Sequence, residues 1–144
     1  MTTVRDLIKH KGSEIVSVRP DDTVFAALKV MADRNVGAVM VVDGEGQLVG
    51  VLSERDYARK VVLQGHTSRE TAAAEIMTRD VVCIPPDKRV EEAMAMMTVK
   101  RIRHLPVMEA GRLIGVVSIG DVGRAIIANQ GFVIEQLERY ICAS

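Results

Sequence analysis

GQLVGVLSERDYARKVV, residues 46–62, returns later in the chain as GRLIGVVSIGDVGRAII, residues 111–127. Both stretches contain Gly-x-x-Ser-x-x-Asp, at 50–56 in the first copy and at 115–121 in the second. Matched glycines, serines and acids have positional reasons to recur, unlike matched apolar residues, so they fix the alignment. The chain therefore contains an internal repeat, with an offset of 65 residues in this part.

The repeat continues upstream, where residues 15–43 align with residues 81–109 at an offset of 66. Each copy begins with a short apolar run, IVSV or VVCI, which predicts a strand followed by a Pro-Asp turn. Apolar residues then recur at i, i+3, i+4 and i+7, which predicts a helix in each copy. Short apolar runs on either side of a Gly-containing turn predict two strands, VGAVMVVD and LVGVLS, or HLPVME and LIGVVS.

A second helix is expected to begin at each Ser-x-x-Asp and to run to Leu63 or Ala128. A short lead-in helix is expected before each copy, at 4–8 and at 73–77. The sequence thus predicts an α/β fold of the α+β type, built from tandem β-α-β-β-α repeats.

Three segments are expected: residues 1–68 as the first repeat with its lead-in helix, 69–130 as the second repeat, and 131–144 as a C-terminal amphipathic helix. A unit of about 60 residues has only a marginal core, so the two repeats are expected to pack together and share burial. The C-terminal helix is expected to pack on this module or on a partner subunit.

The composition of the chain excludes several classes of protein. Lys plus Arg and Asp plus Glu number 19 each among 144 residues, whereas a dedicated nucleic-acid binder usually has a basic excess. Cys83 and Cys142 have no metal-site spacing and are expected to be free thiols. Neither a signal peptide nor a membrane-spanning run is evident, so a cytoplasmic location without membrane contact is expected.

The two Ser-x-x-Asp segments carry the chemistry. Ser53 and Ser118 stand at expected helix starts, where free N–H groups and the helix dipole attract a phosphate. The two oxygens of Asp56 or Asp121 suit adjacent ribose hydroxyls, and the preceding glycine would let a ligand approach the backbone. The same pattern is also a capping box that merely satisfies the helix end. The two interpretations are compatible and both remain open.

The order of elements, the repeated Gly-x-x-Ser-x-x-Asp, EIMT at 75–78 and RHLPV at 103–107 together resemble the CBS-domain family over about residues 4–128. The resemblance implies a stand-alone pair of repeats, packed as a pseudo-twofold disc with two clefts, that forms a homodimer. It also implies a regulatory sensor that binds an adenine nucleotide, AMP first, with ATP or the adenylate part of NAD as alternatives.

The resemblance assigns the serine and acid of one repeat, and strand residues mainly of the other, to each cleft. One cleft is expected to use Ser118, Asp121, Val16, Val36, Gly37, Ala38, Arg103 and His104. The other is expected to use Ser53, Asp56, Val82, Ile102 and Arg103. Lys11 and Thr78 precede the first strands and could reach a phosphate. Arg55, whose counterpart is Gly120, could neutralise charge, so the two clefts are not expected to be equivalent.

No catalytic or metal-binding residues are expected, because neither acid has an acidic neighbour and no Ser-His-Asp set is evident. A ligand-free dimerisation module that regulates a separate partner protein remains the alternative function. His10 and His66 are expected in solvent, whereas His104 could contact a ligand or simply pack. Arg101 is expected in solvent, near a cleft.

Overall fold

The computed structural model describes residues 2–12 and 14–130, so the helix expected at 131–144 lies outside the described residues. The first part of the chain forms α1 (Val4–Lys11), β1 (Ser17–Val18), α2 (Val24–Arg34), β2 (Ala38–Val42), β3 (Leu48–Ser53), α3 (Glu54–Tyr57) and the π-helix η1 (Ala58–Val62). The second part forms α4 (Ala73–Ile76), α5 (Val90–Lys100), β4 (His104–Glu109), β5 (Arg112–Ser118) and α6 (Ile119–Asn129).

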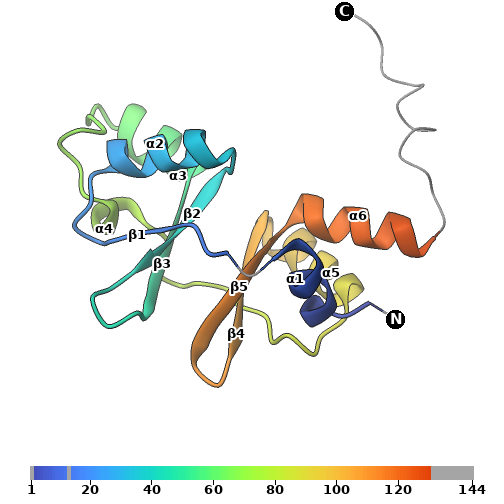
Figure 1. Ribbon diagram of the computed structural model, residues 1–144. Coiled ribbons are helices and arrows are strands. Elements are labelled where there is room, and N and C mark those ends of the chain that lie inside the picture. The colour runs from blue at the N-terminus through green and yellow to red at the C-terminus, as the bar shows by residue number, and fades with distance from the viewer. Residues whose placement is uncertain (1, 13, 131–144) are drawn as a thin grey trace, which may run out of the picture.

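Two small sheets, each with its own helices, lie side by side (Figure 1). In the first sheet β1 is parallel to β2, and β2 is antiparallel to β3. In the second sheet β4 and β5 are antiparallel. The mixed content of helices and strands confirms the predicted α+β class, and the tandem repeat is visible as two similar halves. No helix in the described part of the chain is long and apolar enough to cross a bilayer.

The predicted helices bury the faces that their periodicity indicated. Val24, Ala27 and Met31 of α2 lie in one core. The equivalent residues of α5 lie in a second, separate core with Ile84, Leu105 and Val117. Fully burying one side chain of this size contributes about 1.5–3 kcal/mol. The two halves therefore have distinct cores, one in each repeat.

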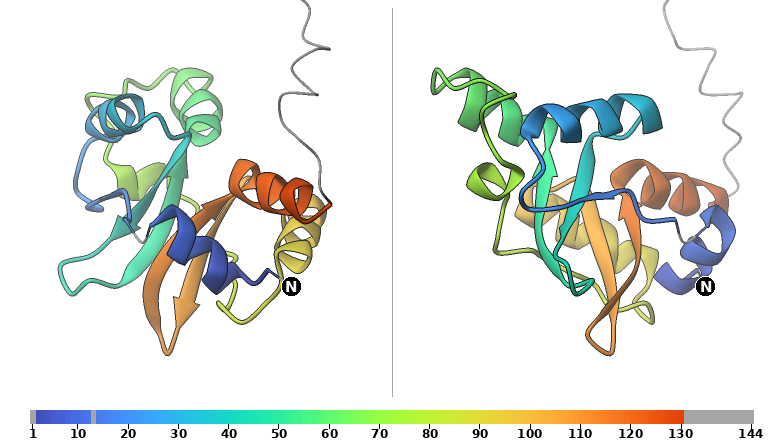
Figure 2. Two further views of the ribbon diagram at one scale, coloured as in Figure 1. Left: turned by 45° about the vertical axis from the view of Figure 1, so that its right-hand side comes forward. Right: turned by 60° about the vertical axis from the view of Figure 1, so that its left-hand side comes forward.

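The lead-in helices cross between the halves, which the sequence did not indicate. Helix α1 packs on the second repeat: Val4 N donates to Lys88 O at 2.8 Å, and Val4, Leu7 and Ile8 join the second core. Helix α4 packs on the first repeat, where Ala73 N donates to Asp22 O at 2.8 Å. Figure 2 shows α1 against the second half from both directions. A boundary at residue 68 separates the two repeats in the sequence. Each core nevertheless includes a lead-in helix from the other side of that boundary.

Gly50 and Gly115 have a packing role, so the expectation that they admit a ligand is wrong. Both lie inside strands, and the crossing lead-in segments cover them. A Cβ built on Gly50 would lie 2.5 Å from Met77 Sδ, and one on Gly115 would lie 2.9 Å from Ile8 Cδ1. The missing side chains therefore let the lead-in segments approach the strands.

The predicted strand at 81–84 is wrong, because only Ile84 makes a bridge, to Val107. In the first repeat Met40 N donates to Val16 O at 3.0 Å. The counterpart of Met40 is Pro106, which has no N–H to donate. The second repeat therefore lacks the hydrogen bond that corresponds to Met40 N–Val16 O, and the carbonyl of Val82 accepts no hydrogen bond from the described residues.

Candidate functional site

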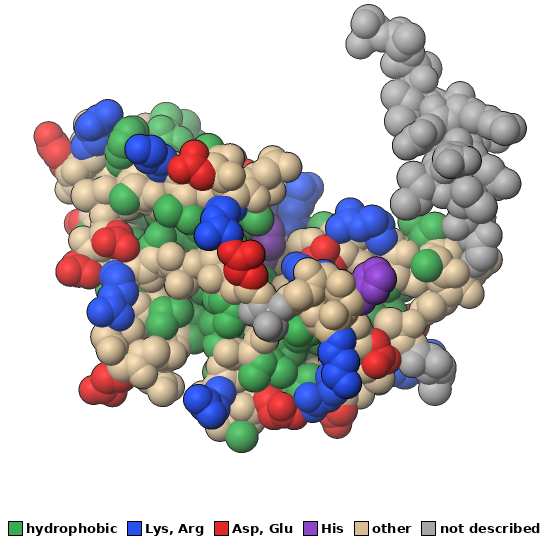
Figure 3. Space-filling model, in the orientation of Figure 1, with side chains coloured by type: hydrophobic (Ala, Val, Ile, Leu, Met, Phe, Trp, Pro, Cys, Tyr) green, Lys and Arg blue, Asp and Glu red, His purple; other side chains and the backbone are tan. Residues whose placement is uncertain are grey.

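A cleft with a volume of about 760 Å³ lies between the two repeats. Figure 3 shows the surface hollowed between the halves, with basic and acidic side chains at the rim. The cleft brings together predicted residues from both repeats. Those that line it are Gly37, Ala38, Ser53, Arg55, Asp56, Thr78, Val82, Ile102, Arg103, His104 and Ser118.

One end of the cleft is the corner formed by Ser53 and Asp56. Asp56 N donates to Ser53 Oγ at 3.1 Å, and Ser53 N donates to Asp56 Oδ2 at 3.0 Å, so the predicted capping box is present. The other oxygen, Oδ1, accepts from Lys60 Nζ at 3.0 Å and from Thr78 Oγ1 at 3.5 Å. Asp56 is 9% exposed and still lines the cleft. The cap and a carboxylate that lines the cleft thus occur together, and both oxygens of that carboxylate accept hydrogen bonds within the protein.

The helix that follows Asp56 is irregular. The sequence predicted one α-helix to Leu63, but η1 is a π-helix, whereas its counterpart α6 is α-helical throughout. Lys60 lies in η1 and also donates to Ile76 O at 2.9 Å, which ties this corner to α4. π-Turns inside helices occur frequently at functional sites. The irregularity therefore marks the Asp56 corner and distinguishes it from the Asp121 corner.

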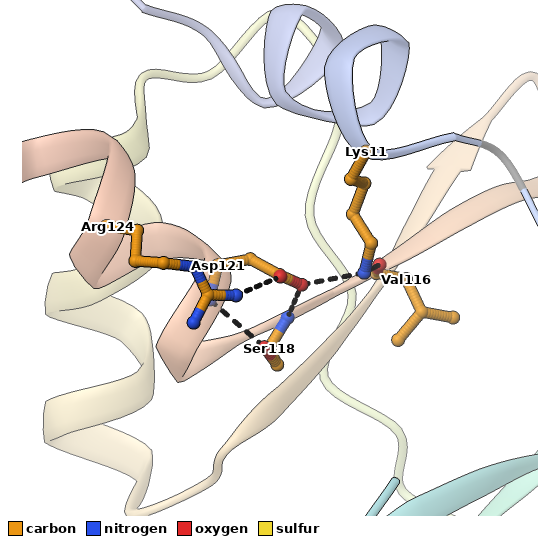
Figure 4. A network of polar contacts seen from close by, with 5 residues as sticks. All are labelled: Lys11, Val116, Ser118, Asp121 and Arg124. Atoms are coloured by element: carbon orange, nitrogen blue, oxygen red, sulfur yellow. Dashed lines mark hydrogen bonds and ion pairs between the residues drawn. The ribbon is translucent and has the colours of Figure 1, made fainter. Parts of the chain in front are cut away.

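The Asp121 corner carries the same cap but has different neighbours (Figure 4). Asp121 N donates to Ser118 Oγ at 3.1 Å. Lys11 Nζ lies 2.6 Å from Asp121 Oδ2 and 3.0 Å from Val116 O, and Arg124 Nη2 lies 2.9 Å from Asp121 Oδ1. Both oxygens of Asp121 are therefore engaged by cations. Ser118 lines the cleft between the repeats, but Asp121 does not.

Three further predicted residues lie away from this cleft. Val16 and Val36 pack against the first core, and Lys11 is held on Asp121 rather than at the cleft surface. The second cleft expected from the resemblance is thus not a mirror image of the first. The two corners differ not only at Arg55 and Gly120, as expected, but also at the two acids: Asp56 lines the cleft with one cation beside it, whereas Asp121 is held by two cations and does not line it.

The pKa values of Asp121 and His104 follow from these contacts. Burial raises the pKa of Asp121, but the hydrogen bonds from Lys11 and Ser118 outweigh it, so the pKa lies below its ordinary value. Burial lowers the pKa of His104, and nearby Lys11 lowers it further. A neutral imidazole is therefore expected in the cleft at neutral pH. A Cβ built on Gly37 would lie 3.7 Å from His104 Cε1, so this ring lies where the repeats meet.

The cleft is lined by charged residues of which the sequence indicated only some. Four lining cations form no ion pair with the described residues: Arg55 and Arg103, which were predicted for the site, Arg101, which was expected near a cleft, and Lys100, which was not expected there. Two lining acids, Glu54 and Asp80, are also unpaired there. Spacing could have found the partners of the two aspartates, since Lys60 is at i+4 from Asp56 and Arg124 is at i+3 from Asp121. Lys11 was predicted as a phosphate contact, but no pattern could have paired it with Asp121, because it reaches the second repeat on a crossing helix.

The family model for the CBS domain matches residues 4–63 and again residues 73–128. The chain belongs to the CBS domain family. Among curated proteins it is similar to the mitochondrial CBS domain-containing protein CBSX3 of Arabidopsis thaliana, 42% identical over 97% of this chain and 72% of that protein. It is also similar to the CBS domain-containing protein YhcV of Bacillus subtilis, 32% identical over 90% of this chain and 89% of that protein.

Solved structures of CBS domain proteins share the fold. A CBS-domain protein of Burkholderia ambifaria, described as acting in signal transduction, is 46% identical with a TM-score of 0.86, over 92% of this chain and 99% of that one. The CBS domain pair of MJ0100, in complex with 5′-methylthioadenosine and S-adenosyl-L-methionine, is 25% identical with a TM-score of 0.79, over 90% of this chain and 98% of that one. The family is one of regulatory modules, and no catalytic family is indicated. Because one relative is mitochondrial, a cytoplasmic location stays a prediction.

Proposed function

We propose that this CBS domain pair is a sensor that binds an adenine nucleotide in the cleft at the Asp56 corner. The carboxylate of Asp56 would receive the ribose hydroxyls, and the unpaired cations of the cleft would attract the phosphate. The apolar wall of Val82 and Ile102 would contact the base. One observation carries the proposal: a carboxylate paired with a single lysine and several unpaired cations line one cleft, with walls from both repeats.

Binding in this cleft would bias how the halves pack, because the ligand would contact elements of both separate cores. The change would pass to a second copy of the chain or to a separate partner protein. Two relatives support this direction. The MJ0100 pair is complexed with adenosine compounds, and a CBS-CP12 protein from bloom-forming cyanobacteria is hexameric.

The test compares Asp56→Asn with Asp121→Asn in titration calorimetry with AMP, ATP and NAD. Asp56→Asn is expected to weaken binding at least about tenfold, because a charge-assisted hydrogen bond contributes about 1.5–3 kcal/mol. Asp121→Asn is expected to change affinity less, because Lys11 and Arg124 already engage that carboxylate. Circular dichroism checks that both variants are folded. Unchanged affinity in Asp56→Asn would contradict the proposal.

The alternative, a ligand-free module that regulates a partner, is favoured by one observation, the closed state of the Asp121 corner. It predicts no thermal shift with any of the three nucleotides, and no nucleotide in the mass spectrum of the purified protein. A partner recovered with a nucleotide-free protein would then support it.

A further inference from the structure

Arg101 has an unusual backbone conformation at the end of α5. Its φ is 56° and its ψ is 45°, in the left-handed region that arginine seldom adopts. Its counterpart at the end of α2 is Asn35, with φ 55° and ψ 48°, and asparagine is one of the residues that tolerate this region. The next amides make matched hydrogen bonds, Val36 N to Met31 O and Ile102 N to Met97 O, both at 3.0 Å. The same turn is therefore built twice, once with a well-suited residue and once with a poorly suited one.

The difference between the two turns is their place relative to the cleft. Arg101 lines the cleft, whereas Asn35 does not. Non-glycine residues in the left-handed region cluster at functional sites, where the cost is offset by what the side chain does. Because Arg101 forms no ion pair with the described residues, its guanidinium is available to a ligand.

The positive charge of the cleft is spread over four separate donors. Arg55, Lys100, Arg101 and Arg103 line it without ion-pair partners among the described residues, and Glu54 and Asp80 offset part of their charge. The excess is about the −1.5 to −2 charges that a ligand with one phosphate monoester carries near neutral pH. Arg55 and Arg103 could contact one phosphate and leave Arg101 for a second. A volume of about 760 Å³ also leaves room beyond a mononucleotide, since it is near the upper end of the 300–1,000 Å³ of ordinary ligand pockets.

We propose that Arg101 is a specificity-determining residue that binds the second phosphate of a nucleotide containing a pyrophosphate linkage. The cleft would then prefer such a nucleotide to AMP. The fork of guanidinium donors suits two oxygens of one phosphate, which a lysine cannot match in the same way. This inference rests on the proposed function, because it needs the adenylate part at the Asp56 corner.

Arg101→Asn, which copies the first repeat, tests the inference by calorimetry with AMP, ADP and NAD. ADP or NAD is expected to bind the variant at least about fivefold more weakly, while AMP changes less than about twofold. Arg101→Lys should lose less ADP affinity than Arg101→Asn, because it keeps the charge but not the fork of donors. Without ligand, Arg101→Asn should melt about 2 °C higher, because the strain is relieved. Comparing the affinity loss for ADP with that for NAD shows whether Arg101 recognises a terminal diphosphate or the pyrophosphate linkage of a dinucleotide.

Asn35→Arg is the matched control. It places the poorly suited residue in the equivalent turn outside the cleft, so it should lower Tm and leave all three affinities unchanged. Equal losses for AMP, ADP and NAD in Arg101→Asn, or no loss, would overturn the inference while leaving the proposed function intact. If the wild-type protein binds none of the three, the proposed function fails first.

Discussion

The two Ser-x-x-Asp corners have the same local structure and different surroundings. In both, the serine hydroxyl accepts from the amide of the aspartate, and the carboxylate accepts from the amide of the serine. Asp56 is partnered by Lys60 from its own helix and opens into the cleft. Asp121 is partnered by Lys11 and Arg124 and does not line it. The motif therefore determines the cap, while neighbouring residues determine which cations the acid meets and whether it lines the cleft.

The difference arises from which residues the crossing segments deliver. Lys11 comes to the second repeat on α1 and donates to Asp121. At the Asp56 corner the crossing segment delivers Thr78 instead, which has no charge and whose hydroxyl donates to Asp56 Oδ1 at 3.5 Å. Asp56 takes its cation from Lys60, whose counterpart is Ala125. Each corner thus has one cation at a place where the other corner has an uncharged residue.

The largest effect is expected where a crossing segment meets a strand. Gly50→Ala should destabilise the protein by about 1–3 kcal/mol, because the new Cβ would lie 2.5 Å from Met77 Sδ and 3.1 Å from the Thr78 carbonyl oxygen. Gly115→Ala should cost less, because it meets only the side chain of Ile8, at 2.9 Å. Urea unfolding of both variants measures the difference.

Gly123→Ala provides the control for that comparison. Gly123 lies in α6, and a Cβ there would meet nothing closer than Met94 Cε at 4.0 Å. The substitution should stabilise the protein by up to about 1 kcal/mol, because alanine is the better helix former. If Gly50→Ala were as stable as wild type, the packing explanation of this glycine would be wrong.

An intermediate effect is expected at the ion pair that closes the Asp121 corner. Lys11→Met should destabilise the protein by about 1 kcal/mol at pH 7, at the upper end for a partly exposed pair. The folded-state pKa of Asp121 is lowered, so its stabilisation is present above the unfolded-state pKa, near 3.9, and is lost as pH falls through the folded-state pKa. Thermal unfolding from pH 7 to pH 2.5 should therefore show the two proteins converging in acid.

Lys60→Met sharpens the same comparison at the other corner. Asp56 is as buried as Asp121 and has no second cation, so this variant should lose about as much as Lys11→Met, about 1 kcal/mol. A difference between wild type and Lys11→Met that persists undiminished at pH 2.5 would show that the lysine acts through packing rather than through Asp121.

The sequence predicted what depends on local pattern. Strands over 48–53 and 104–109 and the helices at 24–34 and 90–100 follow from apolar spacing, turn residues and the matched repeat. The two Ser-x-x-Asp caps follow from the motif itself. The grouping of Ser53, Asp56, Val82, Ile102 and Arg103 at one cleft followed from the family resemblance, and the structure brings these residues together.

What the sequence did not predict depends on contacts between distant segments. The lead-in helices precede their own repeats in sequence, and nothing in their pattern indicates which half they pack on. The pairing of Lys11 with Asp121 and the covering of Gly50 by Met77 both follow from that crossing. The left-handed turn at Arg101 was missed because arginine gives no signal for it.

The smallest effect is expected at Pro106, where the second repeat lacks the hydrogen bond that Met40 makes in the first. Pro106→Val restores an N–H that can donate to the Val82 carbonyl, which contributes about 0.5–1.5 kcal/mol. The loss of proline also frees the unfolded chain by about 0.4–1 kcal/mol, so the net gain should not exceed about 1 kcal/mol. A measurement of stability alone therefore distinguishes poorly between a variant that forms the hydrogen bond to Val82 and one that does not.

Amide exchange separates them better. If the missing N–H is what breaks the strand, the new amide at position 106 should exchange as slowly as that of Met40, and residues 81–84 should pair as Ser17–Val18 do. Val82 also lines the cleft, so engaging its carbonyl would remove an acceptor from any ligand that uses it. Unprotected exchange at position 106 would mean that the path of the chain at 81–84, and not the proline, keeps this segment apart from β4.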